Sequence, residues 1–362
     1  MSGTSMDGID AVLVDFSAAR LQLIAIHNHD YSSGTRALLE SALQLPDPLT
    51  ADLGETDHAV GQAFADATNV LLQQAGMQPD AVVAIGSHGQ TIHHAPNALQ
   101  PCSLQIGNPE IIARQTGIDV VADFRRADIE AGGQGAPLVP AFHRAVFADS
   151  REDRAILNIG GITNITILPA DPALAVTGFD TGPGNTLMDQ WTNRQLGTAM
   201  DLCGDWGRQG TVNQEILAQL MRDDYFGAPP PKSTGREYFN LAWLESVLNG
   251  HPADAADIQA TLCELTAFSI ADAITQYAKT TQRLLVCGGG IHNTLLMERL
   301  TAVLPGMVIE STMDYGIDPD WVEAVAFAWL ARQNLLGKTG NLPEVTGAHH
   351  AVILGRQYRR VT

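Results

Sequence analysis

The stretch Val176-Thr177-Gly178-Phe179-Asp180-Thr181-Gly182-Pro183-Gly184-Asn185 decides the fold class of this chain. An aliphatic run, Leu174 to Val176, leads into a turn rich in glycine, and a helical pattern from Thr186 to Leu196 follows. This order is typical of α/β proteins, which hold ligands at the carboxyl edge of the sheet. Glycines let a ligand approach the backbone, and a helix N-terminus offers N–H groups to an anion. Asp180 is therefore predicted to be a catalytic base at that edge.

A structural role is the alternative for Asp180. Aspartate often caps a helix by accepting a hydrogen bond from a backbone N–H group in its first turn. The next helix is expected to begin near Asn185 or Thr186, several residues beyond the position that a cap requires. The catalytic role is therefore the preferred prediction.

The composition describes an acidic globular protein. The 362 residues suggest two domains, 45% of them are hydrophobic, and the formal net charge is −19. This charge argues against nonspecific binding to nucleic acids and to anionic membranes. No apolar run approaches the roughly 18 residues of a membrane span, the start does not resemble a signal peptide, and the cysteines show no metal-binding spacing. We therefore expect a cytoplasmic protein without nucleic-acid or membrane partners.

Strand and helix patterns alternate in both halves of the chain, which predicts an α/β fold. The run Ala81–Gly86 is wholly apolar, which predicts a strand buried on both faces. The segment 228–235 is the least regular and is expected to be a mobile lid or a substrate loop. Strands are expected at 11–14, 21–26, 81–86, 118–123, 154–160, 164–168, 174–180 and 284–287, and helices at 57–75, 109–116, 212–221, 258–277, 292–304 and 320–336.

Three glycine-rich turns follow or join apolar strands: Ser2–Gly8, Asn158–Asn164 and Cys287–Gly290. Each could present backbone N–H groups to phosphate oxygens. None fits the P-loop or the Rossmann pattern, and a tight β-turn is the alternative for any one of them. Together with Asp180, however, they favour a nucleotide-binding site.

Short sequence motifs around Ser5, His88 and Asp180 also occur around the catalytic triad of subtilisin-like proteases. Their order in the chain does not exclude a triad, but the residues that follow Ser5 are not those that start a helix in that family. Asp-Thr-Gly occurs once, whereas an aspartic protease needs two carboxylates. A hydrolase is therefore disfavoured.

The order and the residues of these motifs resemble those of the anhydro-N-acetylmuramic acid kinases, a family of the sugar kinase/Hsp70/actin superfamily. The resemblance covers essentially the whole chain. The motifs that carry it are Gly3–Asp10, Gly86–Ile92, Gln105–Gly107, Ala122–Arg125, Gly132–Pro140, Leu157–Gly161, Phe179–Asn185, Pro230–Glu237 and Gly340–Ala348.

The resemblance implies two ribonuclease-H-like (actin-like ATPase) domains with an interdomain cleft. Residues 1–125 would form the N-terminal domain and residues 126–362 the C-terminal domain, whose last helix could pack back on the first. It also implies a homodimer. Family members begin with a short apolar strand before the first turn, whereas this sequence begins at Met1-Ser2-Gly3. Because that strand is central in the superfamily's sheet, its absence should weaken the packing of the first phosphate turn.

The implied activity is that of an ATP-dependent kinase. It would open the ring of 1,6-anhydro-N-acetylmuramic acid with water and phosphorylate O6, giving N-acetylmuramic acid 6-phosphate for peptidoglycan recycling. Asp180 would be the base that activates the water. A kinase for another sugar and a nucleotide-dependent scaffold protein are the alternatives.

The resemblance also assigns residues to the substrates. Mg²⁺ would be held through water by Asp7 or Asp10, for which a solvated turn carboxylate is the alternative. Arg236 is a further candidate for the sugar carboxylate, and Glu323 could instead be an ordinary solvated residue. The sugar would contact His88, Arg125, Arg126, Gln134 and Glu323. ATP would contact Gly3, Thr4, Ser5, Met6, Asp7, Gly8, Ile9, Asp10, Asn158, Gly160, Gly161, Gly288, Gly289, Gly290 and Asn293.

Overall fold

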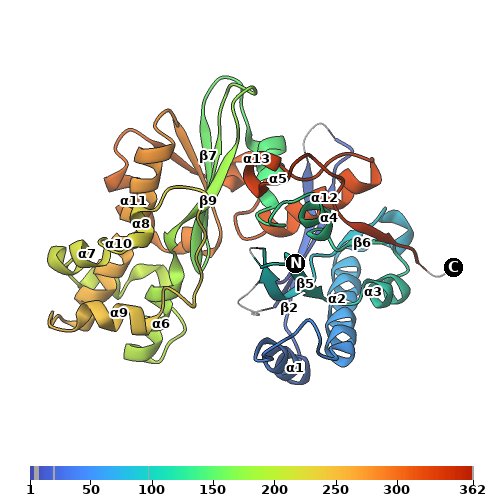
Figure 1. The fold of residues 1–362 in the computed structure, drawn as a ribbon, viewed down its shortest axis with the longest axis horizontal. Helices are drawn as coiled ribbons and strands as arrows, with labels where there is room; N and C mark the ends of the chain where they lie inside the picture. The colour runs from blue at the N-terminus through green and yellow to red at the C-terminus, as the bar shows by residue number, and fades with distance from the viewer. Residues whose placement is uncertain (4–7, 19–20, 97, 361–362) are drawn as a thin grey trace. The chain divides into compact units, whose positions relative to one another are not determined.

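The chain forms two compact units, each with sheets and helices (Figure 1). A computed structural model describes residues 1–3, 8–18, 21–96 and 98–360. Unit 1 comprises Met1–Phe142 and Trp321–Thr362, and unit 2 comprises His143–Asp320. The boundary lies inside helix α5 (Val139–Phe147), later than the 125/126 boundary expected from the sequence. The α/β class predicted from the sequence is confirmed.

The described part of unit 1 contains three separate small sheets. Two are antiparallel hairpins, β1 (Ile9–Asp15) with β2 (Gln22–His29) and β4 (Gln90–Ala95) with β5 (Cys102–Ile106). The third has the order β12-β6-β3, with β6 parallel to β3. Its strands and the helices of the unit are β3 (Ile85–Gly86), β6 (Val120–Ala122), β12 (Arg356–Tyr358), α1 (Ser33–Leu43), α2 (Gly54–Ala75), α3 (Pro109–Thr116), α4 (Arg126–Glu130), α12 (Val322–Leu335) and α13 (Pro343–Thr346).

Local sequence signals set the ends of the helices in unit 1. Helix α2 ends at Gly76, which adopts the left-handed conformation (φ 64°) that glycine tolerates best. Helix α3 begins after Asn108, whose side chain accepts hydrogen bonds from the N–H groups of Glu110 and Ile111, and Pro109 occupies its first position. Both helices therefore lie where the sequence predicted them.

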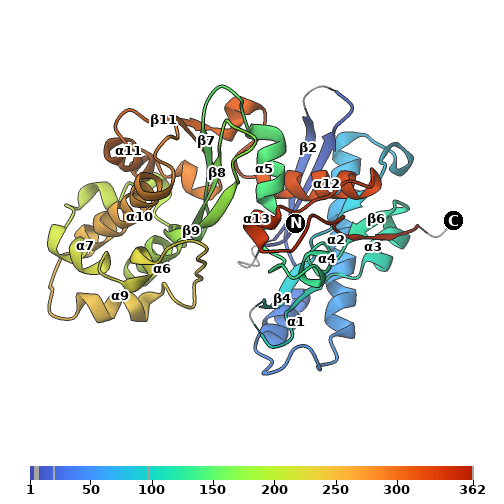
Figure 2. The ribbon, with the colours of Figure 1, turned by 45° about the horizontal axis from the view of Figure 1, so that its top comes forward.

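Unit 2 is built on a five-stranded sheet in its described residues, with the order β11-β10-β7-β8-β9. Strand β10 is parallel to β7 and β11, and β8 is antiparallel to β7 and β9. Figure 2 shows β7, β8 and β9 side by side. The elements are β7 (Arg154–Ile159), β8 (Ile162–Leu168), β9 (Thr177–Pro183), β10 (Arg283–Cys287), β11 (Val308–Ser311), α6 (Asn185–Leu196), α7 (Gln214–Leu220), α8 (Asp224–Gly227), α9 (Leu241–Leu248), α10 (Ala255–Tyr277) and α11 (Thr294–Val303).

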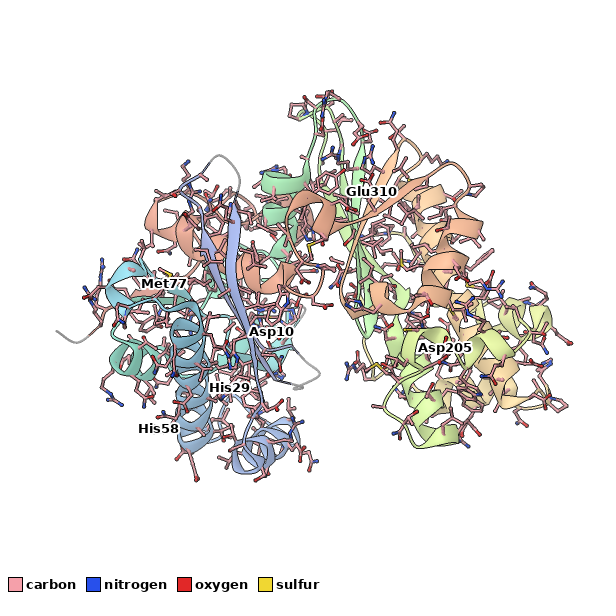
Figure 3. All side chains as sticks on the ribbon, turned by 180° about the vertical axis from the view of Figure 1, so that it is seen from behind. Asp10, His29, His58, Met77, Asp205 and Glu310 are labelled. Atoms are coloured by element: carbon pink, nitrogen blue, oxygen red, sulfur yellow. The ribbon has the colours of Figure 1, made fainter. Side chains whose placement is uncertain are left out.

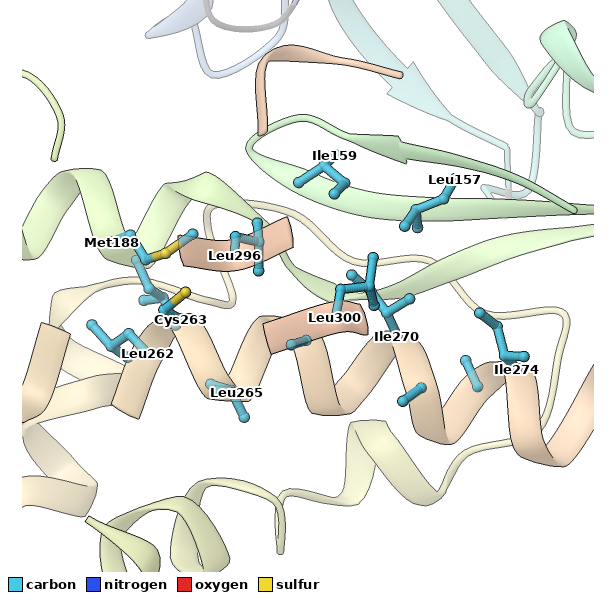
Figure 4. Close-up of a cluster of buried hydrophobic side chains, with 14 of the residues drawn as sticks. Leu157, Ile159, Met188, Leu262, Cys263, Leu265, Ile270, Ile274, Leu296 and Leu300 are labelled. Atoms are coloured by element: carbon cyan, nitrogen blue, oxygen red, sulfur yellow. The ribbon is translucent and has the colours of Figure 1, made fainter. Parts of the chain in front are cut away.

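Helix α10 forms the centre of the core of unit 2. Figure 4 shows Ile270 of this helix near Leu157 of β7 and Leu300 of α11, and all three side chains are buried. Each such side chain stabilises the fold by about 1.5–3 kcal/mol through its removal from water. This core fixes the strands whose ends carry the glycine-rich turns.

Two strands differ from their predicted positions. Strand β9 begins at Thr177 and ends at Pro183, because Phe179 packs opposite Ile165 of β8 while Leu174 is 61% exposed. The run 81–86, predicted to be a buried strand, is a strand only at its last two residues. None of the helices described here has the length and apolar character that a membrane crossing requires.

Candidate active site

The carboxyl ends of β7, β9 and β10 meet at one edge of the sheet in unit 2, because these three strands run in the same direction. Asn158 of β7 lies opposite Cys287 of β10, and Asp180 of β9 lies opposite Asn164 of β8. The turns Gly160–Gly161 and Gly288–Gly290 follow at this edge. The structure therefore brings together the site residues predicted in this half of the chain.

Asp180 lies inside β9, three residues before its end, whereas the sequence predicted it as the last residue of a strand that leads into the glycine-rich turn. Its backbone N–H donates to the carbonyl of Lys232 (3.1 Å), and its own carbonyl accepts from the Tyr225 hydroxyl (2.7 Å). The carboxylate oxygen Oδ2 accepts from the backbone N–H of Thr234 (3.0 Å). The N-cap of α6 is Gly184, so Asp180 does not cap that helix.

The pKa of the Asp180 carboxyl group is shifted towards neutral pH. Burial raises its pKa to about 6, and the hydrogen bond from Thr234 partly opposes this shift. A base with such a pKa is largely ionised at pH 7 and still able to accept a proton. The electrostatics of the position therefore suit general base catalysis.

The segment Tyr225–Thr234 holds Asp180 in place. The Lys232 ammonium donates to the carbonyls of Tyr225 (3.0 Å) and Phe226 (3.2 Å) and lies 4.7 Å from the centre of the Tyr225 ring. Sequence reasoning identified an irregular loop here but missed the roles of Tyr225, Lys232 and Thr234. Their spacing along the chain gives no sign of contact with Asp180.

Three N–H groups at the start of α6 are already hydrogen-bonded, whereas the sequence predicted that they would be unpaired. The backbone N–H of Asn185 donates to the carbonyl of Gly160 (2.9 Å). Those of Gly184 (2.9 Å) and Thr186 (3.1 Å) donate to the carbonyl of Gly161. The Gly160–Gly161 turn therefore binds the helix start through its carbonyl groups.

Two glycines in these turns permit close approaches. A Cβ atom on Gly161 would lie 2.9 Å from Nε of Arg236, so glycine is what allows this exposed guanidinium to lie over the turn. A Cβ atom on Gly288, whose φ is +81°, would lie 2.3 Å from Oδ1 of Asn158. The two turns therefore pack against each other, and a cation lies beside one of them.

The third turn is followed by the 3₁₀ segment Gly289–His292 and by Asn293. Asn293 caps α11, because its Oδ1 accepts from the N–H of Leu296 (3.1 Å). Its side-chain amide nitrogen lies 4.0 Å from Sδ of Met188. The side-chain carbonyl oxygen of Asn293 is thus already hydrogen-bonded. A nucleotide that contacts this side chain would have to use its amide nitrogen.

The first turn, in unit 1, is described only at its two ends, since Thr4–Asp7 lie outside the described residues. The Ser2 hydroxyl lies 2.9 Å from the Gly8 carbonyl and 2.7 Å from Oε1 of Gln90, and Nε2 of Gln90 donates to the Gly3 carbonyl (3.1 Å). Ser2 and Gln90 thereby hold the two ends of the turn together.

Strand β1 continues from this turn. The Ile9 side chain is buried in the core, so a ligand could meet only its backbone. Asp10, labelled in Figure 3, accepts a hydrogen bond at Oδ1 from the Asn28 amide (2.8 Å). Its second carboxylate oxygen takes no part in that bond.

His88 and Arg125 form a buried polar pair in unit 1. Nη2 of Arg125 lies 3.0 Å from Nε2 of His88, and Nη1 donates to the carbonyl of Gly135 (3.2 Å). Burial, and then the Arg125 charge, lower the pKa of His88 well below its usual value, so the ring is neutral. Burial lowers the pKa of Arg125 to about 10, so this side chain stays charged.

Three polar atoms, two of this pair and one of the neighbouring Ser87, are buried without a hydrogen-bond partner among the described residues. They are Oγ of Ser87, Nδ1 of His88 and Nε of Arg125. Because a buried donor without a partner is costly, such a cluster indicates a site that a polar ligand completes.

A pocket of about 150 Å³ lies next to His88 and is also lined by Arg126 and Asp123. The Arg126 side chain is 55% exposed and forms an ion pair with Asp123 (2.7 Å). Asp123 has φ +58°, a conformation that is uncommon outside glycine and clusters at functional sites. Two predicted sugar contacts, His88 and Arg126, thus line one pocket.

The remaining predicted sugar contacts have different environments. Gln134 is exposed, and its backbone N–H donates to the Thr346 carbonyl (2.8 Å). Glu323, in the first turn of α12, is partly buried; burial and the nearby Asp10 raise its pKa, while the Arg125 charge lowers it. Glu323 is therefore less exposed than an ordinary solvated residue.

The family model for anhydro-N-acetylmuramic acid kinase matches residues 1–360. The chain belongs to the anhydro-N-acetylmuramic acid kinase family. This confirms the resemblance that the motifs indicated.

Relatives with this name are similar along the whole chain. An anhydro-N-acetylmuramic acid kinase of Coxiella burnetii (strain Dugway 5J108-111) is 49% identical over 358 residues, which are 99% of this chain and 96% of that relative. One from Shewanella denitrificans is 51% identical over 362 residues, with the same coverage. A solved ROK family glucokinase from Streptomyces griseus, in complex with glucose and AMPPNP, aligns with 90% of this chain and 100% of its own at 13% identity and a TM-score of 0.38. The family assignment rests on the family model and the sequence relatives, and not on this solved structure.

Asp128 is a buried carboxylate near Arg125 in this member of the anhydro-N-acetylmuramic acid kinase family, and sequence reasoning missed it. Its fully buried carboxylate accepts from the backbone N–H of Gly135 (2.8 Å), the Asn341 amide (2.6 Å) and the Thr346 hydroxyl (2.7 Å). Gly135 in turn accepts from Arg125. Asp128 therefore holds the loop that positions a predicted sugar contact.

No group of three or more histidine, cysteine, aspartate or glutamate residues is arranged to hold a metal ion in the part of the chain that is described. Asp7, one of the two predicted Mg²⁺ residues, lies outside that part. Asp10 has a carboxylate oxygen that the Asn28 bond does not use, so it can take part in a water-mediated Mg²⁺ site.

Proposed function

We propose that this protein uses ATP to phosphorylate 1,6-anhydro-N-acetylmuramic acid at O6 while water opens the anhydro ring. The product is N-acetylmuramic acid 6-phosphate, which places the enzyme in peptidoglycan recycling and amino-sugar catabolism. Membership of the family supports the reaction. The observation that supports the mechanism is the raised pKa of Asp180. This carboxylate lies at the carboxyl edge of a sheet, and its pKa is raised to about 6.

The reaction needs one base. A water molecule attacks C1 of the sugar and gives its proton to the Asp180 carboxylate. The C1–O6 bond breaks, its electrons remain on O6, and O6 attacks the γ-phosphorus as ADP leaves. The two bonds that form, O–C1 and O6–P, balance the two that break, and a single carboxylate within hydrogen-bond reach of the water is sufficient.

Phosphoryl transfer depends mainly on positioning and on neutralisation of charge. We assign the phosphates of ATP to the turns at Gly3–Asp10 and Gly160–Gly161, and the nucleoside to Gly288–Gly290 and Asn293. Arg236, which the sequence suggested for the sugar carboxylate, lies exposed beside Gly161, and we assign it instead to the phosphates. Mg²⁺, when bound with ATP, would add positive charge, and Asp7 and Asp10 are the residues that would hold it through water.

The sugar carries a carboxylate and an acetamido group, which need cations and donors. Arg125 and Arg126 supply cations, and neutral His88 has a buried Nδ1 without a partner in the described residues. We assign these residues, with Gln134 and Glu323, to sugar binding. We further propose a cytoplasmic homodimer, which light scattering after gel filtration would test.

A substrate panel tests this proposal. ADP release should be measured with 1,6-anhydro-N-acetylmuramic acid, its analogue without the lactyl group, N-acetylmuramic acid and glucose. We expect turnover with the first, weaker turnover with the second, and a product heavier by one phosphoryl group (HPO₃) and one water. ADP release only with ordinary sugars would indicate another sugar kinase. Nucleotide binding without turnover on any sugar would indicate a scaffold.

A further inference from the structure

Asp223 accepts hydrogen bonds from both ends of one loop in unit 2. It precedes α8, and its Oδ1 accepts from the backbone N–H of Tyr225 (2.9 Å). The same oxygen accepts from the Tyr238 hydroxyl (2.8 Å), and Oδ2 accepts from Nε1 of Trp243 (2.8 Å). These last two donors lie 15 and 20 residues further along the chain. The carboxylate therefore closes the segment 224–243 into a loop.

A helix cap explains only one of these bonds. Helix α8 has four residues, and a serine or an asparagine would accept from the N–H of Tyr225 as an aspartate does. A serine, however, offers a single oxygen on a shorter side chain, whereas the carboxylate of Asp223 serves three donors with two oxygens. The bonds from Tyr238 and Trp243 therefore call for a separate explanation.

Aromatic rings pack around this closure and restrict its movement. Phe239 is fully buried in the core of unit 2. Three neighbouring rings meet it edge-on, with centroids 4.9 to 5.4 Å away: Tyr225, Tyr238 and Trp243. Edge-to-face pairs at such distances are favourable beyond the area that they bury. Because the core fixes Phe239, the two ends of the loop are fixed as well.

The loop carries two groups that the proposed function uses. The backbone N–H of Thr234 donates to the carboxylate of Asp180 (3.0 Å), and the guanidinium of Arg236 lies over the turn at Gly161. Reacting and binding groups have to be held within about 0.5 Å of the productive geometry. Closing a loop at both ends removes much of the conformational freedom that would blur such positions.

Tyr225 belongs both to the closure and to the site. Its N–H donates to Asp223, whereas its hydroxyl donates to the backbone carbonyl of Asp180 (2.7 Å). Burial, and then the charge of Asp180, raise the pKa of this phenol, so it remains a donor at every pH at which the enzyme would be assayed. The Lys232 ammonium in turn donates to the carbonyl of Tyr225 (3.0 Å). One residue therefore connects Asp223 to the proposed base.

We propose that Asp223 is a positioning residue of this kinase, which closes the loop so that one segment presents both the Thr234 N–H to the base and the Arg236 guanidinium to the phosphates. Asp223 would act through the loop and not on the substrates. The inference rests on the proposed function for the roles of Asp180 and Arg236. Loss of the closure should therefore change two properties together, the acid limb of the pH profile and the KM for ATP.

The first test measures hydrogen exchange in four variants without substrates. Asp223→Ala removes the closure and the cap, and Asp223→Ser keeps an acceptor for the cap alone. The double variant Tyr238→Phe/Trp243→Phe removes the two distant donors and keeps an aromatic ring at both positions. Asp224→Ala, at an exposed neighbour, controls for the loss of one negative charge. We expect exchange at the Thr234 N–H to be at least about tenfold faster in the first three variants and unchanged in the control.

Two outcomes of this test would overturn the proposal. Protection of the Thr234 N–H that persists in the double variant or in Asp223→Ser would make Asp223 a helix cap only. Equally fast exchange in Asp224→Ala would show that the lost charge, and not the closure, loosens the loop. A parent protein without turnover would refute the proposed function, while the exchange data would still decide whether Asp223 closes the loop.

Steady-state kinetics give the second test, in variants whose circular dichroism matches that of the parent. In Asp223→Ala and in the double variant, the acid limb of kcat/KM should move up by about one pH unit, because an Asp180 carboxylate without the Thr234 N–H is less stable as an anion. The KM for ATP should rise about five- to tenfold through the displaced Arg236, and Asp224→Ala should change neither. A lower kcat with an unmoved acid limb and an unchanged KM for ATP would show a merely structural role and overturn the proposal.

Discussion

Removal of one backbone N–H group should change the pH at which the enzyme works. Thr234→Pro deletes the hydrogen bond that the carboxylate of Asp180 accepts at 3.0 Å. A hydrogen bond to a charged group contributes about 1.5–3 kcal/mol, and one pKa unit corresponds to about 1.4 kcal/mol. The pKa of Asp180, already raised by burial to about 6, should therefore rise by about one to two units in this variant.

The sign of the effect on activity follows from the role of the base. Only ionised Asp180 can accept a proton from water, so kcat/KM should fall about tenfold per pH unit below pH 6 in the parent protein. In Thr234→Pro the same decline should begin one to two units higher. Relative to the parent protein, kcat/KM of Thr234→Pro should be about tenfold lower near pH 6.5 and nearly equal at pH 9.

The assay is ADP release with limiting sugar between pH 5 and pH 9.5, with circular dichroism to confirm the fold. Thr234→Ala is the matched control, because it removes the side chain and keeps the N–H group. Its acid limb should coincide with that of the parent. An unshifted acid limb in Thr234→Pro, or an equal shift in Thr234→Ala, would refute the assignment of this limb to Asp180.

Three further substitutions test the site. Asp180→Asn should lower kcat by about 10²–10⁴ while ATP affinity, measured by calorimetry, stays within about twofold; retained turnover would remove Asp180 from the mechanism. Arg236→Ala should lower kcat/KM for ATP by about 10–100-fold, whereas the exposed control Arg222→Ala should not, and equal effects would contradict the phosphate role. Asp128→Ala removes the acceptor of three buried donors, so urea unfolding should show a loss of about 3–5 kcal/mol, against little change for exposed Glu130→Ala.

Much of the fold could be predicted because its signals are local. Gly76 ends α2 and Asn108 caps α3 through contacts within a few residues, which a sequence pattern can indicate. The glycine-rich turns could be predicted as well, since they follow apolar strands that pair in parallel or as hairpins.

The partners of the site residues could not be predicted, because they depend on tertiary packing. Thr234 is 54 residues from Asp180, and Asn341 is 213 residues from Asp128. The availability of the N–H groups at α6 was predicted wrongly for the same reason, since the carbonyls of Gly160 and Gly161 occupy them. The apolar run 81–86 was predicted to be a buried strand, but only its last two residues form a strand and Val83 is 82% exposed.

The most direct test of the central claim is to follow the oxygen atom of water into the product. The reaction is run with 1,6-anhydro-N-acetylmuramic acid and ATP in H₂¹⁸O, and the sugar phosphate is fragmented in a mass spectrometer. Unlabelled product incubated in the same water controls for exchange at C1. Our account predicts one ¹⁸O at C1 and none in the phosphate group. An unlabelled C1, or label in the phosphate, would contradict attack of activated water on the anomeric carbon.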